Sequence, residues 1–125
     1  MKTKLIGKKK FTVKNQKDFA GISCDYNPIH VNALIARRSV SGNQIVHGVN
    51  ILLTALNLLF KNKYYFKFNK IKCTFHNPAN IGEYISFIKN IYKNKLLIEI
   101  KNESALLATI ILYSLLDASF LPPYG

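Results

Sequence analysis

The longest regular pattern of hydrophobic and polar residues runs from Ile45 to Phe60. Four polar positions interrupt it and a fifth follows it, with spacings of three, four, three and four residues: His47, Asn50, Thr54, Asn57 and Lys61. This spacing places the polar side chains in one narrow stripe on an α-helix and leaves its other faces apolar. We therefore expect a helix over residues 45–60 that is buried on nearly all sides, wrapped by a curved sheet.

After this helix the pattern changes to the two-residue period of β-strands. Phe66 and Phe68 alternate with polar neighbours, and the alternation resumes at Ile71 in the opposite phase and continues through Cys73 and Phe75. A change of phase reverses the face on which the apolar side chains lie. The sequence thus predicts a bulge or a strand break between residues 69 and 70.

The C-terminal third of the chain predicts three further strands. Residues 84–92 and 95–101 form a hairpin pattern around Lys93-Asn94, with Leu96, Ile98 and Ile100 on one face. The almost continuously apolar residues 105–116 favour a central strand buried on both faces, with a second helix as the alternative. One buried helix followed by four strands predicts an α+β protein with the chain order of a hot-dog fold, in which a long central helix is wrapped by an antiparallel sheet.

The N-terminal region predicts shorter elements. Residues 5–13 are a candidate edge strand, and residues 15–23 can form one or two helical turns with Asn15 as a possible N-cap. Residues 24–44 contain many turn-forming residues and are expected to be irregular. A length of 125 residues predicts one domain over residues 1–125.

Composition also bears on where the protein acts. No apolar run reaches the roughly 18–20 residues that a membrane span needs. The basic N-terminus is not followed by a long apolar stretch, so we expect no signal peptide and a cytoplasmic protein. In that compartment Cys24 and Cys73 are expected to be reduced thiols.

The segment with the clearest chemical content is Asp25-Tyr26-Asn27-Pro28-Ile29-His30. The residue types alone leave two interpretations open. Asp25 can simply cap the turn that Asn27-Pro28 favours. Alternatively, the rigid turn brings the Asp25 carboxylate and the His30 imidazole within hydrogen-bond reach of one water molecule, which is an arrangement for acid–base catalysis.

This segment resembles the motif of MaoC-like dehydratases and (R)-specific enoyl-CoA hydratases. The matching residues are Ser23, Asp25, Asn27, Pro28, Ile29, His30 and Ala36. A second element of that family appears as Ile45-Val46-His47-Gly48 at the start of the expected helix, and a third as Phe75, Pro78, Gly82 and Glu83. Three elements in the family's order favour the catalytic interpretation over the turn alone.

The resemblance implies a hydratase or dehydratase of fatty acid metabolism that acts on acyl thioesters. Asp25 and His30 would be the catalytic pair, and the backbone N–H of Gly48 would bind the thioester oxygen. Asn27 and His47 would contribute to substrate binding, although the residues themselves favour a structural role for His47 over one in lining the site. No cofactor and no metal is implied, since the three histidines and Cys24 show no ligand spacing. The chain departs from the family at Cys24, where Gly is usual, at Asn32, where an acid is common, and at Gln44, where Pro is common.

The formal net charge of +12 has two readings. Most lysines are scattered, and only Lys8–Lys10 and Arg37-Arg38 form runs, so we expect no nucleic-acid partner. A basic surface also suits the phosphates of coenzyme A or an acidic acyl carrier protein.

Family resemblance further implies a homodimer, in which two sheets pair edge to edge. Two alternative functions remain: a hot-dog acyl-CoA thioesterase, and a non-catalytic module that binds acyl groups.

Overall fold

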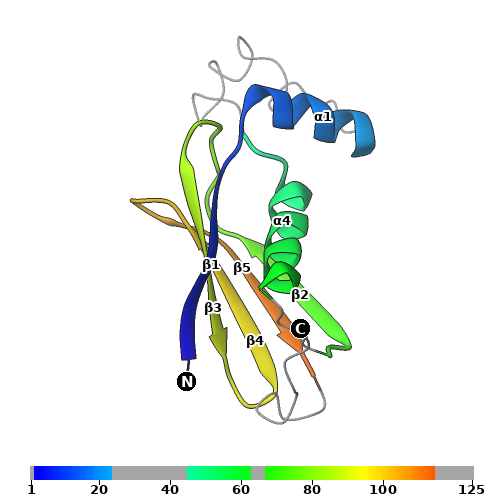
Figure 1. Ribbon diagram of the computed structural model, residues 1–125, viewed down its shortest axis with the longest axis vertical. Coiled ribbons are helices and arrows are strands. Elements are labelled where there is room, and N and C mark those ends of the chain that lie inside the picture. The colour runs from blue at the N-terminus through cyan, green and yellow to red at the C-terminus, as the bar shows by residue number, and fades with distance from the viewer. Residues whose placement is uncertain (1, 24–44, 63–66, 115–125) are drawn as a thin grey trace.

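The computed structural model describes residues 2–23, 45–62 and 67–114, which form one antiparallel sheet with a helix along it (Figure 1). The elements in chain order are β1 (Lys2–Lys10), α1 (Val13–Ser23), α4 (Gly48–Lys61), β2 (Lys70–Phe75), β3 (Tyr84–Ile91), β4 (Lys95–Lys101) and β5 (Leu106–Tyr113). The strand order in the sheet is β1-β3-β4-β5-β2. Figure 1 shows α4 lying along one face of the sheet, with α1 beside the end at which α4 begins. The predicted α+β architecture is confirmed.

The core lies between α4 and the inner face of the sheet. Leu96, Ile98 and Ile100 of β4 are fully buried, as the hairpin pattern predicts. They face the buried side of α4, whose buried residues are Ile51, Ala55 and Leu59. Burial of aliphatic side chains of this size contributes roughly 1.5–3 kcal/mol each relative to exposure. These contacts therefore hold α4 to the sheet.

Strand β5 is a central strand, as predicted for residues 105–116. It pairs with β4 on one side and with β2 on the other. Its burial nevertheless alternates, because Thr109, Ile111 and Tyr113 on the outer face are only half-buried. The expectation of burial on both faces was thus wrong: α4 covers only the inner face of the sheet.

Strand β2 begins at Lys70, where the alternation changes phase. Its register with β5 places Ile71, Cys73 and Phe75 on the inner face, opposite the buried Leu112, Ile110 and Ala108. The phase change thus marks the start of a strand, because residues 67–69 before it are not in a strand and residue 66 lies outside the described residues. Because β2 is the last strand of the sheet, its outer edge has no strand partner among the described residues.

Helix α1 begins two residues earlier than its pattern predicts. The side-chain oxygen of Thr12 accepts from the backbone N–H of Asn15 (3.1 Å), and the side-chain oxygen of Asn15 accepts from the backbone N–H of Thr12 (2.9 Å). This reciprocal pair is a capping box with Thr12 as the N-cap. Asn15, predicted to be the N-cap, instead satisfies the N-cap residue's own backbone N–H.

Helix α4 begins at Gly48 rather than at Ile45. Residues 45 and 46 are extended instead, because Ile45 bridges Asn80 and the backbone N–H of Val46 donates to the carbonyl oxygen of Ala79 (2.7 Å). The side-chain amide of the buried Gln16 on α1 donates to the carbonyl oxygen of Ile45 (2.7 Å). Contacts with α1 and with the loop before β3 therefore fix where α4 starts.

The outward face of α4 differs from the predicted polar stripe. Asn57 and Lys61 are exposed, whereas Asn50 and Thr54 are half-buried and His47 is buried. Three apolar side chains are exposed instead, namely Val49 (58%), Leu53 (51%) and Phe60 (43%). The expected burial on nearly all sides is thus not found in this single chain. Within the residues described here, no helix has the length and apolar character needed to cross a membrane.

Replacing Gln16 with Leu should destabilise the fold. The substitution keeps an apolar stem in the buried site but removes the hydrogen bond to the Ile45 carbonyl oxygen. Loss of one partner of a buried hydrogen bond costs about 1–3 kcal/mol. Urea unfolding monitored by circular dichroism measures this, and Lys17→Ala on the exposed side of α1 is the control. Equal free energies of unfolding for the two variants would contradict the role assigned to Gln16.

Candidate functional site

The candidate site is centred on the first turn of α4. The backbone N–H of Ile51 donates to the carbonyl oxygen of His47 (3.2 Å) and so makes the first hydrogen bond of the helix. The N–H of Gly48 precedes that bond and has no acceptor within the helix. Such groups carry the partial positive charge of the helix N-terminus and are suited to binding an oxygen that carries negative charge.

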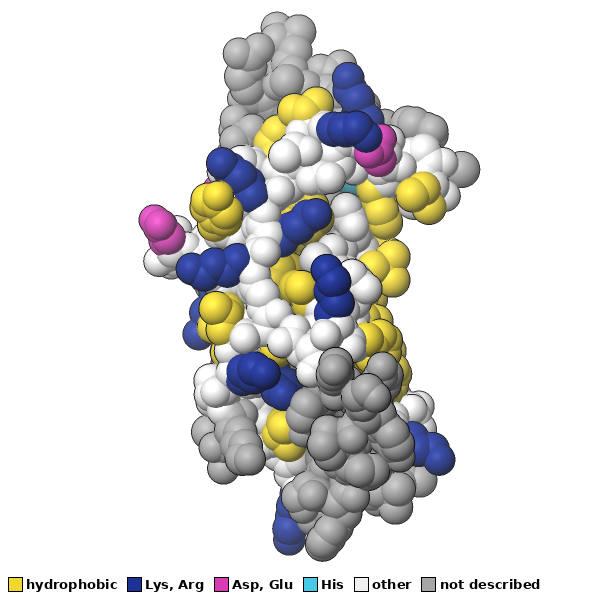
Figure 2. Space-filling model, viewed as in Figure 1, with side chains coloured by type: hydrophobic (Ala, Val, Ile, Leu, Met, Phe, Trp, Pro, Cys, Tyr) yellow, Lys and Arg dark blue, Asp and Glu magenta, His cyan; other side chains and the backbone are white. Residues whose placement is uncertain are grey.

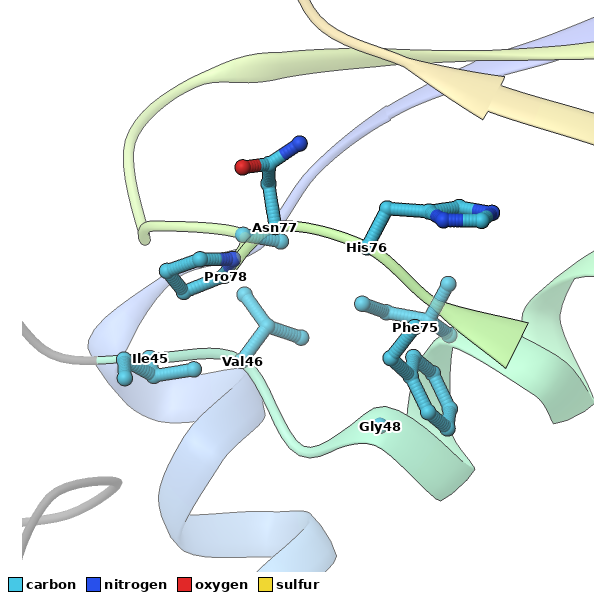
Figure 3. Close-up of a pocket in the computed structure, with 9 residues that line it drawn as sticks. Ile45, Val46, Gly48, Phe75, His76, Asn77 and Pro78 are labelled. Atoms are coloured by element: carbon cyan, nitrogen blue, oxygen red, sulfur yellow. The ribbon is translucent and has the colours of Figure 1, made fainter. Parts of the chain in front are cut away.

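A cavity of about 360 Å³ adjoins this turn. One wall is formed by Ile45, Val46, Gly48 and Ile51, and the other by residues 75–79. Figure 3 shows the Phe75 side chain beside Gly48, whereas the side chains of His76 and Asn77 point the other way. The cavity therefore presents a mainly apolar surface that includes the first residue of α4. A site of that kind suits an acyl chain attached to a polar carbonyl group.

Gly48 is closely covered by Phe75. A Cβ atom added at Gly48 would lie 2.8 Å from Cζ of the Phe75 ring, closer than van der Waals contact allows. A side chain at position 48 would therefore displace the ring. Glycine therefore allows the ring of Phe75 to lie directly against the start of α4.

The wall opposite α4 is held by backbone hydrogen bonds. The N–H groups of His76 and Asn77 both donate to the carbonyl oxygen of Leu107, at 2.8 and 3.2 Å. These bonds continue the pairing of β2 with β5 beyond Phe75. As a result the inner wall of the cavity is attached to a central strand of the sheet.

The third sequence element, which ends at Gly82 and Glu83, forms the turn that follows this wall. Gly82 has a φ of 82°, in the left-handed region that favours glycine. The carboxylate of Glu83 accepts from the backbone N–H of Asn80 (3.2 Å) and from the side-chain amide of Asn102 (3.1 Å). In the structure, both residues therefore stabilise the loop that carries the cavity wall.

His47 is buried, with 1% of its surface exposed. Its ring packs against the ring of Phe19 on α1, with 4.9 Å between ring centroids and an angle of 57° between the ring planes. The cavity wall includes its neighbours Val46 and Gly48 but not His47. The sequence leaves His47 either a structural or a substrate-binding role. In the structure its ring forms a packing contact with α1 at the start of α4.

The predicted residues Asp25, Asn27 and His30 lie outside the described residues, so their roles remain predictions. Among the described residues, no group of three or more His, Cys, Asp or Glu side chains is placed to hold a metal ion. His76 is exposed, and its Nε2 lies 2.9 Å from the hydroxyl of Thr109. Burial raises the pKa of the Cys73 thiol, which favours the protonated form and makes this cysteine a poor nucleophile.

Sequence reasoning missed two residues of this region. Phe75 was noticed only as a member of the third element, and nothing in the sequence indicated that its ring covers Gly48. Gln16 carried no signal as a residue that anchors the segment before α4, since glutamine is usually exposed. In both cases the contact joins segments 27 or more residues apart, Gln16 with Ile45 and Gly48 with Phe75.

Comparison with known proteins adds the family context. The family model of the MaoC like domain matches residues 2–109. No curated protein matches the chain at the threshold applied.

Three solved structures illustrate the likeness, which at identities of 14–21% concerns the fold alone. An (R)-hydratase from A. caviae involved in PHA biosynthesis is 19% identical with a TM-score of 0.75, covering 90% of this chain and 94% of its own. A monoamine oxidase regulatory protein from Archaeoglobus is 21% identical with a TM-score of 0.80, covering 97% and 90%. The HadBC (3R-hydroxyacyl-ACP dehydratase) complex from Mycobacterium tuberculosis contains a chain that is 14% identical with a TM-score of 0.66, covering 84% and 87%. The predicted hot-dog fold is confirmed.

Proposed function

The chain belongs to the MaoC-like domain family, and from this premise we propose that it is a hydro-lyase acting on acyl thioesters. In this proposal it catalyses the reversible hydration of a 2-enoyl thioester to the (R)-3-hydroxyacyl thioester. The acyl group is carried either by coenzyme A or by an acyl carrier protein. One similar structure is an (R)-hydratase and another a 3R-hydroxyacyl-ACP dehydratase, which supports both directions of the reaction.

The observation that carries this proposal is the position of Gly48. Gly48 is the first residue of α4 and lines an apolar cavity of about 360 Å³. Hydration of an enoyl thioester moves negative charge onto the thioester oxygen as the enolate forms. An N–H group at a helix N-terminus stabilises such charge without having to reorient, and a preorganised donor of this kind typically contributes about 10²–10³ in rate.

Asp25 and His30 supply the proton transfers in this mechanism. In the hydration direction, this pair removes a proton from one water molecule while the water oxygen forms a bond to Cβ. The electrons of the carbon–carbon double bond move to give the enolate, and a proton is then delivered to Cα. One proton is removed and one is returned, so neither a cofactor nor a metal is needed.

Incubation with a short and a long 2-enoyl-CoA tests the proposal, with loss of the enoyl absorbance as the measurement. A hydratase removes that absorbance without releasing free thiol. Thiol release from saturated acyl-CoA would instead identify a thioesterase, which attacks the carbonyl carbon. Binding without any turnover would identify a non-catalytic acyl-binding module.

We also propose that the protein is a homodimer joined at the β2 edge. The outer edge of β2 has no partner strand in the described part of the chain, and two of its inner-face residues, Ile71 (40%) and Phe75 (52%), remain exposed. Helix α4 also has three exposed apolar side chains, those of Val49, Leu53 and Phe60. A second copy paired antiparallel at β2 would satisfy the edge and cover apolar surface on both elements.

The dimer predicts that a charge in this surface prevents assembly. Ile71→Glu and Leu53→Glu should each convert the protein to a monomer at micromolar concentration, because burial of an unpaired carboxylate in an interface is costly. Sedimentation velocity measures the change. Leu5→Glu, at a half-exposed position on the opposite edge strand, is the matched control and should remain dimeric. A monomeric wild-type protein would refute the proposed interface.

A further inference from the structure

Two lysines and two tyrosines form a row across one end of the outer face of the sheet, the face opposite α4. Lys70 on β2 and Lys95 on β4 are both register partners of Tyr113 on β5. The Lys70 ammonium lies 5.3 Å from the centre of the Tyr113 ring, and the Lys95 ammonium lies 5.2 Å from the centre of the Tyr92 ring. We call Lys70, Tyr113, Lys95 and Tyr92 the Lys–Tyr row. The aromatic rings hold the two ammonium groups at defined positions.

The positive charge of this row is not neutralised within the described part of the chain. The described part of the chain contains four acidic residues, Asp18, Glu83, Glu99 and Glu103. Asp18 pairs with Lys14, and Glu99 lies 4.0 Å from Lys101. No ion pair among the described residues joins an acid to Lys70 or Lys95. Exposed Lys72 and Lys93 add further positive charge beside the row. Figure 2, which views one side of the molecule, shows many lysine and few acidic side chains.

We propose that the Lys–Tyr row is the docking site for an acidic helix on the protein that carries the acyl thioester. This inference rests on the function proposed above and decides between its two carriers in favour of a carrier protein. The spacing fits that partner. Lys70 and Lys95 stand on strands separated by β5, so that their backbones lie about 10 Å apart at about 4.8 Å per strand. Carboxylates seven residues apart on one helix face lie about 10.5 Å apart, at 1.5 Å per residue.

The chemistry of the row favours carboxylates over a nucleic-acid strand. Proteins that bind single-stranded nucleic acids stack bases on open aromatic faces. In the Lys–Tyr row, an ammonium group lies over each tyrosine ring. Lysine is also a point charge, without the forked geometry with which arginine binds phosphate. The row therefore suits single carboxylates on a protein surface.

The proposed dimer brings this row toward the site of the other subunit. Antiparallel pairing at β2 places opposite ends of the two strands side by side. In a pair centred on Lys72, Lys70 of the partner subunit lies beside Thr74, the residue before Phe75, and Phe75 borders the cavity near Gly48. A carrier docked on the outer face of one subunit would then stand at the end of β2 that borders the cavity of the other, on the opposite side of the sheet.

Charge reversal at the row tests the proposal. The double variant Lys70→Glu/Lys95→Glu should lower kcat/KM for an enoyl group on a carrier protein by about tenfold or more, because steering of a charged partner acts on association. The same enoyl group on coenzyme A should change by less than about twofold, since its exposed charge contacts are screened. Lys8→Glu/Lys17→Glu, with the same change in net charge at exposed positions elsewhere, is the matched control and should spare both substrates.

A second variant removes charge but keeps the side-chain stems. Lys70→Met/Lys95→Met keeps an unbranched apolar side chain at each position and should reproduce part of the selective loss. Raising the salt from about 20 to about 300 mM should reduce wild-type activity steeply on the carrier-linked substrate and much less on the CoA-linked one. Parallel losses on the two substrates, or no loss on either, would overturn the docking site.

Direct binding separates this proposal from the proposed function. If the wild-type protein turns over neither substrate, the proposed function fails, and the row is then tested with a fluorescently labelled acyl carrier protein. Binding that is lost in Lys70→Glu/Lys95→Glu and kept in the control variant supports the docking site. Absence of carrier binding overturns it. Binding of a single-stranded oligonucleotide through these lysines in place of the carrier overturns it as well.

Discussion

Replacement of Asp25 by Asn, or of His30 by Ala, is expected to lower kcat by about 10² or more. Each residue would take part in proton transfer through the same water molecule, and acid–base groups typically contribute about 10²–10⁴ in rate. The amide of Asn keeps the size of the Asp25 side chain but cannot accept the proton. The measurement is the rate at which the absorbance of a saturating enoyl-CoA disappears, with circular dichroism to show that each variant is folded.

The double variant of this pair gives the sharper result. Groups that act as a unit are not additive, so Asp25→Asn/His30→Ala should be about as slow as the slower single variant. Asp18→Asn provides the control, because this exposed carboxylate on α1 pairs with Lys14 and does not line the cavity. A folded single variant at Asp25 or His30 with the turnover of the wild type would disprove the assignment.

Local patterns in the sequence predicted most of the sheet. The hairpin around Lys93-Asn94 is found between β3 and β4, and the phase change after residue 69 marks the start of β2. Such strands can be predicted from sequence because the alternation of apolar and polar residues indicates which face of the strand is covered. The pattern of residues 105–116 correctly indicated a central strand, but it could not show that only one face is covered by a helix.

Contacts between distant segments could not be predicted in the same way. Helix α4 starts at Gly48 because residues 45 and 46 are bound to Asn80, Ala79 and Gln16. The helical pattern of residues 45–60 gives no indication of those partners and therefore could not predict where the helix begins. The exposed Val49, Leu53 and Phe60 also contradict burial on all sides within one chain. Apolar periodicity shows that a face avoids water, but not whether the same chain or a second copy covers it.

The same division holds for the candidate site. Gly48 was predicted from the family resemblance, and the structure places it at the start of α4 beside a cavity. The structure alone identifies Phe75 as the side chain that covers it. Two explanations follow for the absence of a side chain at position 48. Either the ring of Phe75 needs that space, or a ligand does.

Substitution of Gly48 by Ala distinguishes these explanations and should reduce kcat/KM by about 10²-fold. The added Cβ would lie 2.8 Å from the ring of Phe75 and would also stand in the path of a ligand that approaches the Gly48 N–H. Displacement of a reacting group by about 1 Å can cost about 10² in rate. Phe75 is 52% exposed, so its ring can turn away and stability should change little. The measurements are steady-state kinetics on an enoyl-CoA and urea unfolding.

Removal of the ring then separates the two effects. In a Phe75→Ala background the Cβ at position 48 has no ring to displace, so a purely steric role for Gly48 predicts that Gly48→Ala no longer matters. If the thioester oxygen must reach the N–H of Gly48, the loss caused by Gly48→Ala persists in that background, because Cβ still occupies the ligand's path. We expect persistence. Full recovery of kcat/KM to the level of Phe75→Ala alone would show that Gly48 serves only to accommodate Phe75, and the oxygen-binding role proposed for its N–H would lose its main support.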